Sequence, residues 1–448
     1  MDSPKLSLKK YAAVITVLLA IVMTVLDITV VNVALPVMAR DFAVSESDSV
    51  WIVTIYQLVI TMLLLPMSAI GDKYSYRQVM LVGIALFVLD SVLCALSGSL
   101  IFILVSRAFQ GIGGACVMAV NVALVRLIYP SDVLGRGLAL NAMVIAIATA
   151  AGPTIAGAIL SITTWHWLFI INVPIGIIAL IIGIKLLPEN PPRTKNLSFD
   201  KVSAISNMVV FGLIFYSVGK FAKNDHLILS GILLLAGIIL GIFYLKRQTQ
   251  QSEPLLPVDL FRNKTYSLSI ATYMSSFIAQ TVIMIALPFL FINNLEFDEM
   301  TTGLLMTPWP LATLVVSPVA ARLAEHFNPG RIAAIGMAVF VFGATFLLLE
   351  TDMSKIDIAW RMVVCGIGFG LFQTPNNIIM IQSTPISRSG AAGGMQGTSR
   401  LVGQTLGSTI VTILFAINSA IPSATRFCLI ISIVCALLAG IFSLQRML

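Results

Sequence analysis

Long apolar segments, separated by short polar ones, follow one another along almost the whole chain. Each has about 20 mostly apolar residues, the length that an α-helix needs to cross the hydrocarbon core of a bilayer. Backbone N–H and C=O groups find no water in that core, so helices are the expected form. The pattern predicts fourteen membrane-spanning helices, at 11–35, 49–70, 78–98, 100–127, 135–160, 166–187, 203–222, 226–246, 265–292, 300–323, 331–350, 357–381, 391–417 and 425–446.

The composition agrees with an all-α polytopic membrane protein. Of the 448 residues, 58% are hydrophobic and only 10% are charged, and the mean hydropathy is +0.98. A water-soluble protein of this length could not bury so much apolar surface. We expect no cleavable signal peptide, because the first apolar segment is too long for an h-region. The five cysteines all fall in apolar segments without metal-binding spacing, and we interpret them as packing residues.

Basic residues are divided unevenly between the two sets of loops. Most of the 27 Lys and Arg residues fall in loops on the side of the two termini, whereas the opposite loops carry only Arg40, Lys220, Lys223, Lys355 and Arg426. Cytoplasmic loops of membrane proteins carry such an excess, so both termini are predicted to be cytoplasmic. The same bias accounts for the net charge of +7 without a nucleic-acid partner.

The two ends of the chain repeat each other at an offset of about 252 residues. The matched pairs are 34–36 and 286–288, Pro66 and Pro318, Arg77 and Arg331, Arg107 and Arg361, Arg136 and Arg388, and Gly152 and Gly403. Six pairs in order at nearly one offset predict two related six-helix bundles. We therefore divide the chain into an N-terminal bundle (1–190), two inserted membrane helices (191–250), and a linker with a C-terminal bundle (251–448).

Several motifs resemble those of the major facilitator superfamily. The stretches are "LDITVVNVALP", "SAIGDKYSYRQVM" (68–80), "RAFQGIGGA" (107–115), "AIATAAGPTIAG" (146–157) and "WHWLFIINVPIG" (165–176). Together they are typical of its fourteen-helix drug:proton antiporter branch and are most similar to bacterial methyl-viologen and quaternary-ammonium compound exporters. Ser68, Ser75 and Tyr76 depart from the family's loop pattern, and Ala148 and Ala156 replace two glycines of its antiporter pattern. The resemblance implies two six-helix bundles plus two inserted helices.

One acid, Asp27, lies within the first apolar segment. An ionised carboxylate in a bilayer costs roughly 2.5 kcal/mol or more, so it needs a cation, a proton or water. The resemblance implies that Asp27 couples transport to protons. Arg107, in the fourth predicted span, is the intramembrane base expected to pair with it. A permanent Asp–Arg pair that only fixes helix packing, or an Arg107 that reaches the surface, is the alternative. We expect Arg361 near the surface. Asp90 is a third proton-coupling candidate, with a packing role as its alternative.

The resemblance assigns gating to a loop and a kink. Asp72, Lys73 and Arg77 belong to the loop after the second helix, which in this family latches the second helix to the eleventh helix of the core fold. Gly152 and Pro153 kink the fifth helix, where a small-residue face prevents a proton leak between the bundles. Ordinary loop charge and generic helix packing are the alternative interpretations.

Polar and aromatic residues in the predicted spans are candidates for the substrate cavity. They are Asn32, Gln57, Trp309, Phe372, Gln373, Asn376 and Asn377. Gln373 and Asn377 share a helix face by their i,i+4 spacing. Such amides either line a substrate path or tie helices together, and the sequence leaves both open.

These observations predict a secondary active transporter, not an enzyme. No GxxxxGK[ST] stretch occurs, so ATP drive is not expected, and the three histidines form no metal cluster. The expected function is proton-coupled export of lipophilic, mainly cationic drugs or biocides across the bacterial cytoplasmic (inner) membrane, by a monomer without a cofactor. Export of a metabolite, siderophore or lipid is the alternative within transport. A membrane receptor or assembly protein with an inactive facilitator fold is the alternative outside it.

Overall fold

A computed structural model describes residues 8–130, 133–190, 200–222, 227–251, 254–349, 354–385, 388–418 and 420–446. These residues form helices and connecting segments, and no strand occurs in the described ranges. The elements are α1 (Leu8–Asp41), α2 (Glu46–Lys73), α3 (Tyr76–Ala95), α4 (Leu100–Ile128), α5 (Leu134–Ile162), α6 (Trp167–Ile170), α7 (Asn172–Leu186), α8 (Lys201–Ala222), α9 (Leu227–Thr249), η1 (Val258–Arg262), α10 (Lys264–Phe289), η2 (Leu290–Asn294), α11 (Glu299–Met306), α12 (Pro308–His326), α13 (Pro329–Leu349), α14 (Lys355–Gln382), α15 (Ser389–Ile417) and α16 (Ile421–Gln445).

Fourteen helical segments of the described chain are long and apolar enough to span a membrane, which confirms the predicted number. Three of these spans are composite, and they are formed by α6 with α7, α10 with η2, and α11 with α12. The break between α11 and α12 falls at Thr307, directly before Pro308. Proline has no backbone N–H and therefore cannot make the helix hydrogen bond at this point, so the sequence explains this break.

Polar residues at the helix starts set several boundaries. The side chain of Ser75 accepts a hydrogen bond from the backbone N of Gln78 at the start of α3. Ser354 and Asp357 form a reciprocal capping box at the start of α14. Such caps satisfy N–H groups that have no partner inside the helix.

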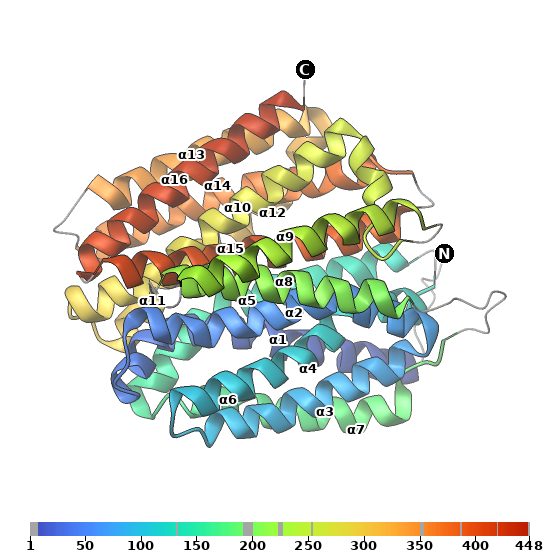
Figure 1. Cartoon of the computed structure of the whole chain (residues 1–448), viewed down its shortest axis with the longest axis horizontal. Coiled ribbons are helices and arrows are strands. Elements are labelled where there is room, and N and C mark those ends of the chain that lie inside the picture. Colours follow the sequence, from blue (N-terminus) through green and yellow to red (C-terminus); the bar gives the residue numbers. More distant parts are fainter. Residues whose placement is uncertain are drawn as a thin grey trace.

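The helices are arranged in two bundles that lie side by side, as Figure 1 shows, with α1 to α7 on one side and α10 to α16 on the other. In both bundles two helices pack closely because a glycine lies at their contact. A Cβ atom on Gly113 of α4 would lie 2.7 Å from the backbone N of Phe87 in α3. A Cβ atom on Gly368 of α14 would lie 2.4 Å from the backbone N of Phe340 in α13. The internal repeat is therefore visible in the packing as well as in the sequence.

The inserted helices α8 and α9 lie beside the two bundles. Helix α8 packs against α2 of the first bundle and α15 of the second, and α9 packs mainly on α8. The side chain of Asn207 in α8 donates a hydrogen bond to the carbonyl of Met62 in α2 at 2.8 Å. In Figure 1 this green pair crosses the view between the bundles. The pair thus covers, from outside, the seam where α2 meets α15.

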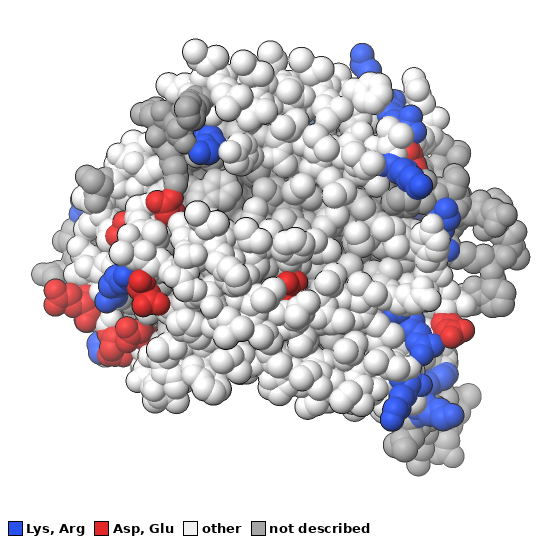
Figure 2. Space-filling view, turned by 60° about the horizontal axis from the view of Figure 1, so that its bottom comes forward, with Lys and Arg blue, Asp and Glu red and all other residues white. Residues whose placement is uncertain are grey.

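Charged residues gather at the two ends of the helices. We call the end where α1 begins and α16 ends the terminal face, and the other end the opposite face. Figure 2 shows mostly basic residues toward the terminal face and acidic residues with a few basic ones toward the opposite face. An almost uncharged band separates them, as expected for a chain that crosses a bilayer. The assignment of the terminal face to the cytoplasm remains a prediction.

Candidate functional site

Asp27 and Arg107 meet in the interior of the N-terminal bundle. Asp27 lies in the middle of α1 and Arg107 lies two turns into α4, and both side chains are fully buried. The Nη1 group of Arg107 donates a hydrogen bond to Oδ2 of Asp27 in a buried ion pair. The surface alternative for Arg107 is therefore wrong. Helix α4 starts at Leu100, but neighbouring helices cover the side chain of Arg107 despite its position near that end.

Two amides also bind the carboxylate. Gln110, one turn after Arg107 in α4, donates from Nε2 to Oδ1 of Asp27 at 3.2 Å. Asn172, the first residue of α7, donates from Nδ2 to the same oxygen at 3.3 Å. The carboxylate thus has three side-chain donors from two other helices. Such donors stabilise its ionised form, whereas burial away from water disfavours that form.

The guanidinium of Arg107 is held on several sides. Its Nε donates to the carbonyl of Ile52 in α2 at 3.1 Å, and its Nη1 also donates to Oε1 of Gln110 at 2.6 Å. The ring of Tyr56 lies 4.1 Å from its Cζ, a cation–π contact. Its Nη2 is buried and has no hydrogen-bond partner among the described residues. The cation is therefore fixed by α1, α2 and α4 with one donor unused.

This arrangement can respond to a proton or to a cation. Removing the charge of one member of a buried ion pair leaves the other uncompensated, at a cost of roughly 3–5 kcal/mol. Protonation of Asp27 therefore favours any rearrangement that gives Arg107 a new partner. A positively charged ligand near Asp27 competes with Arg107 in the same way. The centre is thus suited to exchange, beyond fixing three helices together.

Sequence reasoning named two members of this centre and missed the others. Gln110 and Asn172 lie inside the quoted motifs "RAFQGIGGA" and "WHWLFIINVPIG", and the i,i+3 spacing of Arg107 and Gln110 was a usable signal. Tyr56 gave no signal at all. Arg361 is 3% exposed, so its expected surface position is wrong. Helices packed on α14 cover it, although it lies only two turns from the helix start.

The predicted gate loop is bound within its own bundle. The hydroxyl of Tyr76 donates to Asp72, and Asn190, just beyond α7, accepts from the backbone N of Tyr76 at 2.9 Å. Arg77 pairs with Glu189 at 3.0 Å. Tyr76 is one of the departures from the family's loop pattern, and here it supplies a partner for Asp72. These three contacts lie within the first bundle. The gating role of Asp72, Lys73 and Arg77 remains a prediction.

Gly152 and Pro153 lie where α5 contacts both bundles. A Cβ atom on Gly152 would lie 1.9 Å from Oγ1 of Thr29 in α1, so only glycine fits there. The carbonyl of Pro153 approaches Gly303 of α11, where a Cβ atom would lie 2.4 Å away. Gly152, on the small-residue face predicted for α5, therefore packs on α1, whereas α11 of the other bundle packs on Pro153 and Gly157. The function of this face as a seal against proton leak stays a prediction.

The bundles meet toward the opposite face. The hydroxyl of Ser47 donates to the carbonyl of Thr412 at 2.8 Å, which joins α2 to α15. The hydroxyls of Thr154 and Thr307 lie 2.6 Å apart, which joins α5 to α11 and α12. At the terminal end of α15, the space around the Cβ position of Gly393 contains no other residue within 4 Å. Direct contacts between the bundles thus lie toward the opposite face and, through the hydroxyls of Thr61 and Thr405 at 3.1 Å, in the middle of α2 and α15.

The candidate cavity residues fall into two groups. Trp309 and Phe372 are fully buried in the second bundle, where both approach Phe369. Asn376 is also buried and accepts from Arg446. In this structure these three side chains serve packing and helix ties, and their cavity role remains a prediction.

The second group has unused amide oxygens. Asn32, Gln57 and Asn377 each bury a side-chain oxygen that has no hydrogen-bond partner within the described ranges. Gln373 lies one turn before Asn377 in α14. Buried polar atoms without partners are rare and call for a ligand, an ion or water. The indole Nε1 of Trp309 is likewise buried without a hydrogen-bond partner among the described residues, so these amides and Trp309 are better supported as candidates than Phe372.

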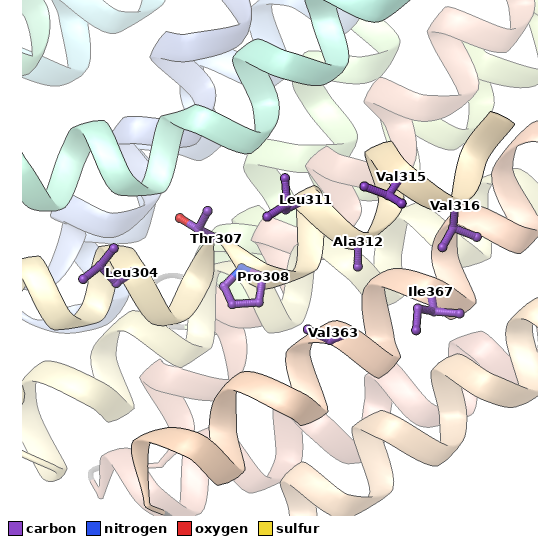
Figure 3. A pocket seen from close by; sticks show the side chains of 9 residues that line it. All are labelled: Leu304, Thr307, Pro308, Leu311, Ala312, Val315, Val316, Val363 and Ile367. Atoms are coloured by element: carbon purple, nitrogen blue, oxygen red, sulfur yellow. The ribbon is translucent and has the colours of Figure 1, made fainter. Parts of the chain in front are cut away.

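An apolar hollow of about 420 Å³ lies beside the break between α11 and α12. Figure 3 shows Thr307 and Pro308 at the break, with Val363 and Ile367 of α14 across from them. Leu311 on its rim is half exposed, so the hollow opens to the surface of the second bundle. It is suited to an acyl chain or another apolar group, and its lining contains no charged residue.

No metal centre is found in the part of the chain that the structure describes, where no group of three His, Cys, Asp or Glu side chains could hold an ion. The residues of the candidate site are instead one ion pair with amide and aromatic partners. Groups of this kind are suited to binding and releasing a proton or a cation.

Comparison with known sequences gives matches over nearly the whole chain. Residues 17–271 and 268–446 match the family described as Major Facilitator Superfamily. The chain is 44% identical over 436 residues to the protein named Uncharacterized transporter YebQ of Escherichia coli (strain K12), which covers 97% of this chain and 95% of the relative.

More distant relatives have more specific names. Riboflavin transporter RibZ of Clostridioides difficile (strain 630) is 28% identical and covers 91% of this chain and 89% of its own length. Multidrug efflux pump LfrA of Mycolicibacterium smegmatis (strain ATCC 700084 / mc(2)155) is 29% identical, with coverages of 93% and 83%.

A crystal structure of a D-xylose-proton symporter superposes with a TM-score of 0.70 at 13% identity, covering 97% of each chain. At this identity the likeness shows the fold alone. Together with the sequence matches it confirms the predicted fold class and the prediction of a transporter rather than an enzyme.

Proposed function

The chain belongs to the major facilitator superfamily, and we propose that it is a proton-coupled antiporter that exports lipophilic, mainly cationic compounds by alternating access. The observation that carries this proposal is the buried pair of Asp27 and Arg107 in the first bundle. Relatives named for multidrug efflux support the substrate class. We place the protein in the bacterial inner membrane, as a monomer with both termini in the cytoplasm.

The proposed cycle starts from the state in which the bundles touch toward the opposite face. Contacts such as Ser47 with Thr412 close that face, so substrate enters from the terminal side. A cationic substrate favours ionised Asp27 because opposite charges attract. The bundles then rock so that the site opens to the outside, where a proton binds Asp27 and displaces the cation. With Asp27 neutral, the bundles return to the starting state. Substrate and proton thus alternate on one carboxylate.

Arg107 links that exchange to movement. With Asp27 ionised, Arg107 holds α4 against α1, and its Nε holds the carbonyl of Ile52 in α2. When a proton neutralises Asp27, the guanidinium loses its counter-charge and favours another acceptor. Helix α2 contacts α15 of the second bundle, so a shift of Arg107 reaches the interface between bundles. A two-state element biased by both ligands is what coupling requires.

The proposal is tested in liposomes that contain the purified protein and a pH-sensitive dye. Addition of a lipophilic cation, such as a quaternary ammonium compound, to the substrate side should drive proton movement in the opposite direction. The Asp27→Asn variant should insert and fold but should show no proton movement. Substrate movement that proceeds without any proton flux would overturn the antiport mechanism.

Export of a metabolite is a second candidate, because RibZ is named as a riboflavin transporter. The unused oxygens of Asn32, Gln57 and Asn377 are suited to a polar, uncharged substrate. A competition experiment distinguishes a cationic substrate from a metabolite. A neutral heterocyclic metabolite that blocks export of the cation, and is itself moved, would favour the metabolite.

A further inference from the structure

A second carboxyl group, Asp90 of α3, is buried in the same bundle. It is 3% exposed, and its Oδ2 has no hydrogen-bond partner among the described residues. Asp90 lies about one and a half turns from the end of α3 at the opposite face. An ionised carboxylate in this position is costly without a cation or a donor. A proton is therefore the simplest partner that the site can take.

The side chains next to Asp90 reach the centre at Asp27. Ser91 accepts a hydrogen bond from Nε2 of Gln110 at 2.9 Å, and Gln110 also donates to Asp27. Cys94 is one turn beyond Asp90 on the same helix face, and its Sγ lies 3.7 Å from Oε1 of Gln110. The amide of Gln110 thus joins α3 to Asp27.

Titratable groups face α3 from the helices packed on it. Helix α4 contributes Arg107 and α2 contributes Tyr56, whose ring packs against Phe87 of α3. Helix α6 carries no titratable group, and the titratable residue of α7 is Lys185, at its far end. Arg107 is therefore the one cation in the middle of this bundle that faces α3 from the elements packed on it.

Small polar side chains continue from Asp90 toward the opposite face. Cys94 and Ser97 follow at i+4 and i+7, on one side of the helix and just past its end, and both are buried. At 1.5 Å per residue, this row covers about 10 Å. It runs inside the first bundle, apart from the seam that Ser47 and Thr412 close.

We propose that Asp90 is a second proton-binding site, which receives protons from the opposite face and supplies them to Asp27 past Ser91 and Gln110. The inference rests on the proposed function, because Asp27 is the recipient. In the transfer an O–H bond breaks at Asp90 and one forms at Asp27. A water molecule carries the proton and is regenerated, while Ser91 and Gln110 keep their own protons and hold the geometry.

The first test is infrared difference spectroscopy of the full-length reconstituted protein during a pH titration, without any substrate. Wild type should show two protonated-carboxyl bands. Asp27→Asn should remove one, Asp90→Asn the other, and Asp90→Glu should shift the second. If Asp90→Asn does not fold, the shift in Asp90→Glu decides alone. A spectrum in which neither Asp90 variant alters a band would overturn the proposal.

The second test is transport at different external pH values. Asp90→Asn should slow proton-driven export about tenfold or more where external protons are scarce, and much less where they are abundant. Asp90→Glu should restore the rate. Glu296→Gln removes an exposed acid at the same face and should change nothing. An equal loss at every pH would make Asp90 a packing residue.

The two proposals fail separately. If wild type moves substrate without protons, antiport is wrong, yet the infrared titration still shows whether Asp90 binds protons. If Asp27→Asn abolishes coupling while Asp90→Asn matches wild type at every pH, antiport stands and the role of Asp90 is wrong.

Discussion

The two bundles share one scaffold, but the fully buried ion pair of Asp27 and Arg107 belongs to the first. In each bundle a glycine of one helix packs against the backbone of a phenylalanine in the neighbouring helix. The pairs are Gly113 with Phe87 and Gly368 with Phe340. An offset of 252 residues from Asp27 leads to Ala279, which is buried and apolar. Arg361, the counterpart of Arg107, is buried as well. The comparison separates the residues that build the fold from those that carry chemistry.

In the second bundle, a cluster of polar groups near the terminal face joins helices by hydrogen bonds. Arg446, just after α16, donates to Ser269 of α10 at 2.9 Å and to Asn376 of α14. This cluster ties three helices of one bundle together near one end. A rigid second bundle beside a first bundle with a titratable centre fits a division of labour, in which proton events change the first bundle.

The largest expected effect comes from removing the acid at position 27, whose counterpart in the second bundle is Ala279. Asp27→Asn should lower proton-driven export by about a hundredfold or more, because an amide of the same shape cannot take up a proton. Efflux from inverted membrane vesicles with an imposed pH gradient measures this. The matched control is Ala279→Ser at the equivalent position of the second bundle, which should transport normally. Export by Asp27→Asn at the wild-type rate would remove Asp27 from the coupling step.

The shared scaffold should be equally sensitive in both bundles. Gly113→Ala and Gly368→Ala each place a Cβ atom against backbone and should destabilise the protein by about 1–3 kcal/mol. Thermal unfolding in detergent, followed by loss of the monodisperse species, measures the effect. Gly393→Ala, at an open position in α15, is the control. If only one of the two buried substitutions is harmful, the structural equivalence of the bundles is wrong.

A substitution in the gate loop should alter the balance between the state that is open to the terminal face and the state that is open to the opposite face. Asp72→Asn weakens the acceptor for Tyr76 and should weaken the state that is open to the opposite face, by up to about tenfold. Labelling of single cysteines at Gly393, near the terminal face, and at Thr412, which is buried where the opposite face is closed, reports the two accessibilities. More labelling at Gly393 and less at Thr412 is expected. Identical labelling with intact transport would leave Asp72 as an ordinary loop charge.

The smallest effect concerns the attachment of the inserted helices. Burial raises the pKa of Asp200, but hydrogen bonds from Ser203, Gln251 and Arg247 outweigh it and hold the pKa below the ordinary value of 3.8. Such a group stabilises the folded form at neutral pH, and this contribution falls as the pH drops below about 4. Asp200→Asn should remove that pH dependence.

Proteolysis near the ends of α8 and α9 at graded low pH measures this loosening. Wild type should become more sensitive as the pH falls, and Asp200→Asn should be sensitive throughout. Wild-type protection that does not change with pH would contradict a role for the Asp200 and Arg247 pair, whose N–O distance is 3.1 Å.

The sequence predicted the fourteen spans well because apolar length is a local property. It also predicted the partnership of Asp27 and Arg107, because two opposite charges in a bilayer favour each other. It could not give the donors from Gln110 and Asn172, since their distances depend on how three helices pack. Burial of Arg361 was missed for the same reason. The bond from Tyr76 to Asp72 was hidden because Tyr76 had been noted only as a departure from a pattern.

The central claim is that one carboxylate binds either a proton or the substrate. The most direct measurement is proton release on substrate binding, by purified wild type and Asp27→Asn in weakly buffered detergent solution with a pH indicator. Wild type should release protons when a lipophilic cation is added, and Asp27→Asn should release none even where it still binds the cation. Binding to wild type without proton release, or equal release by Asp27→Asn, would contradict the account.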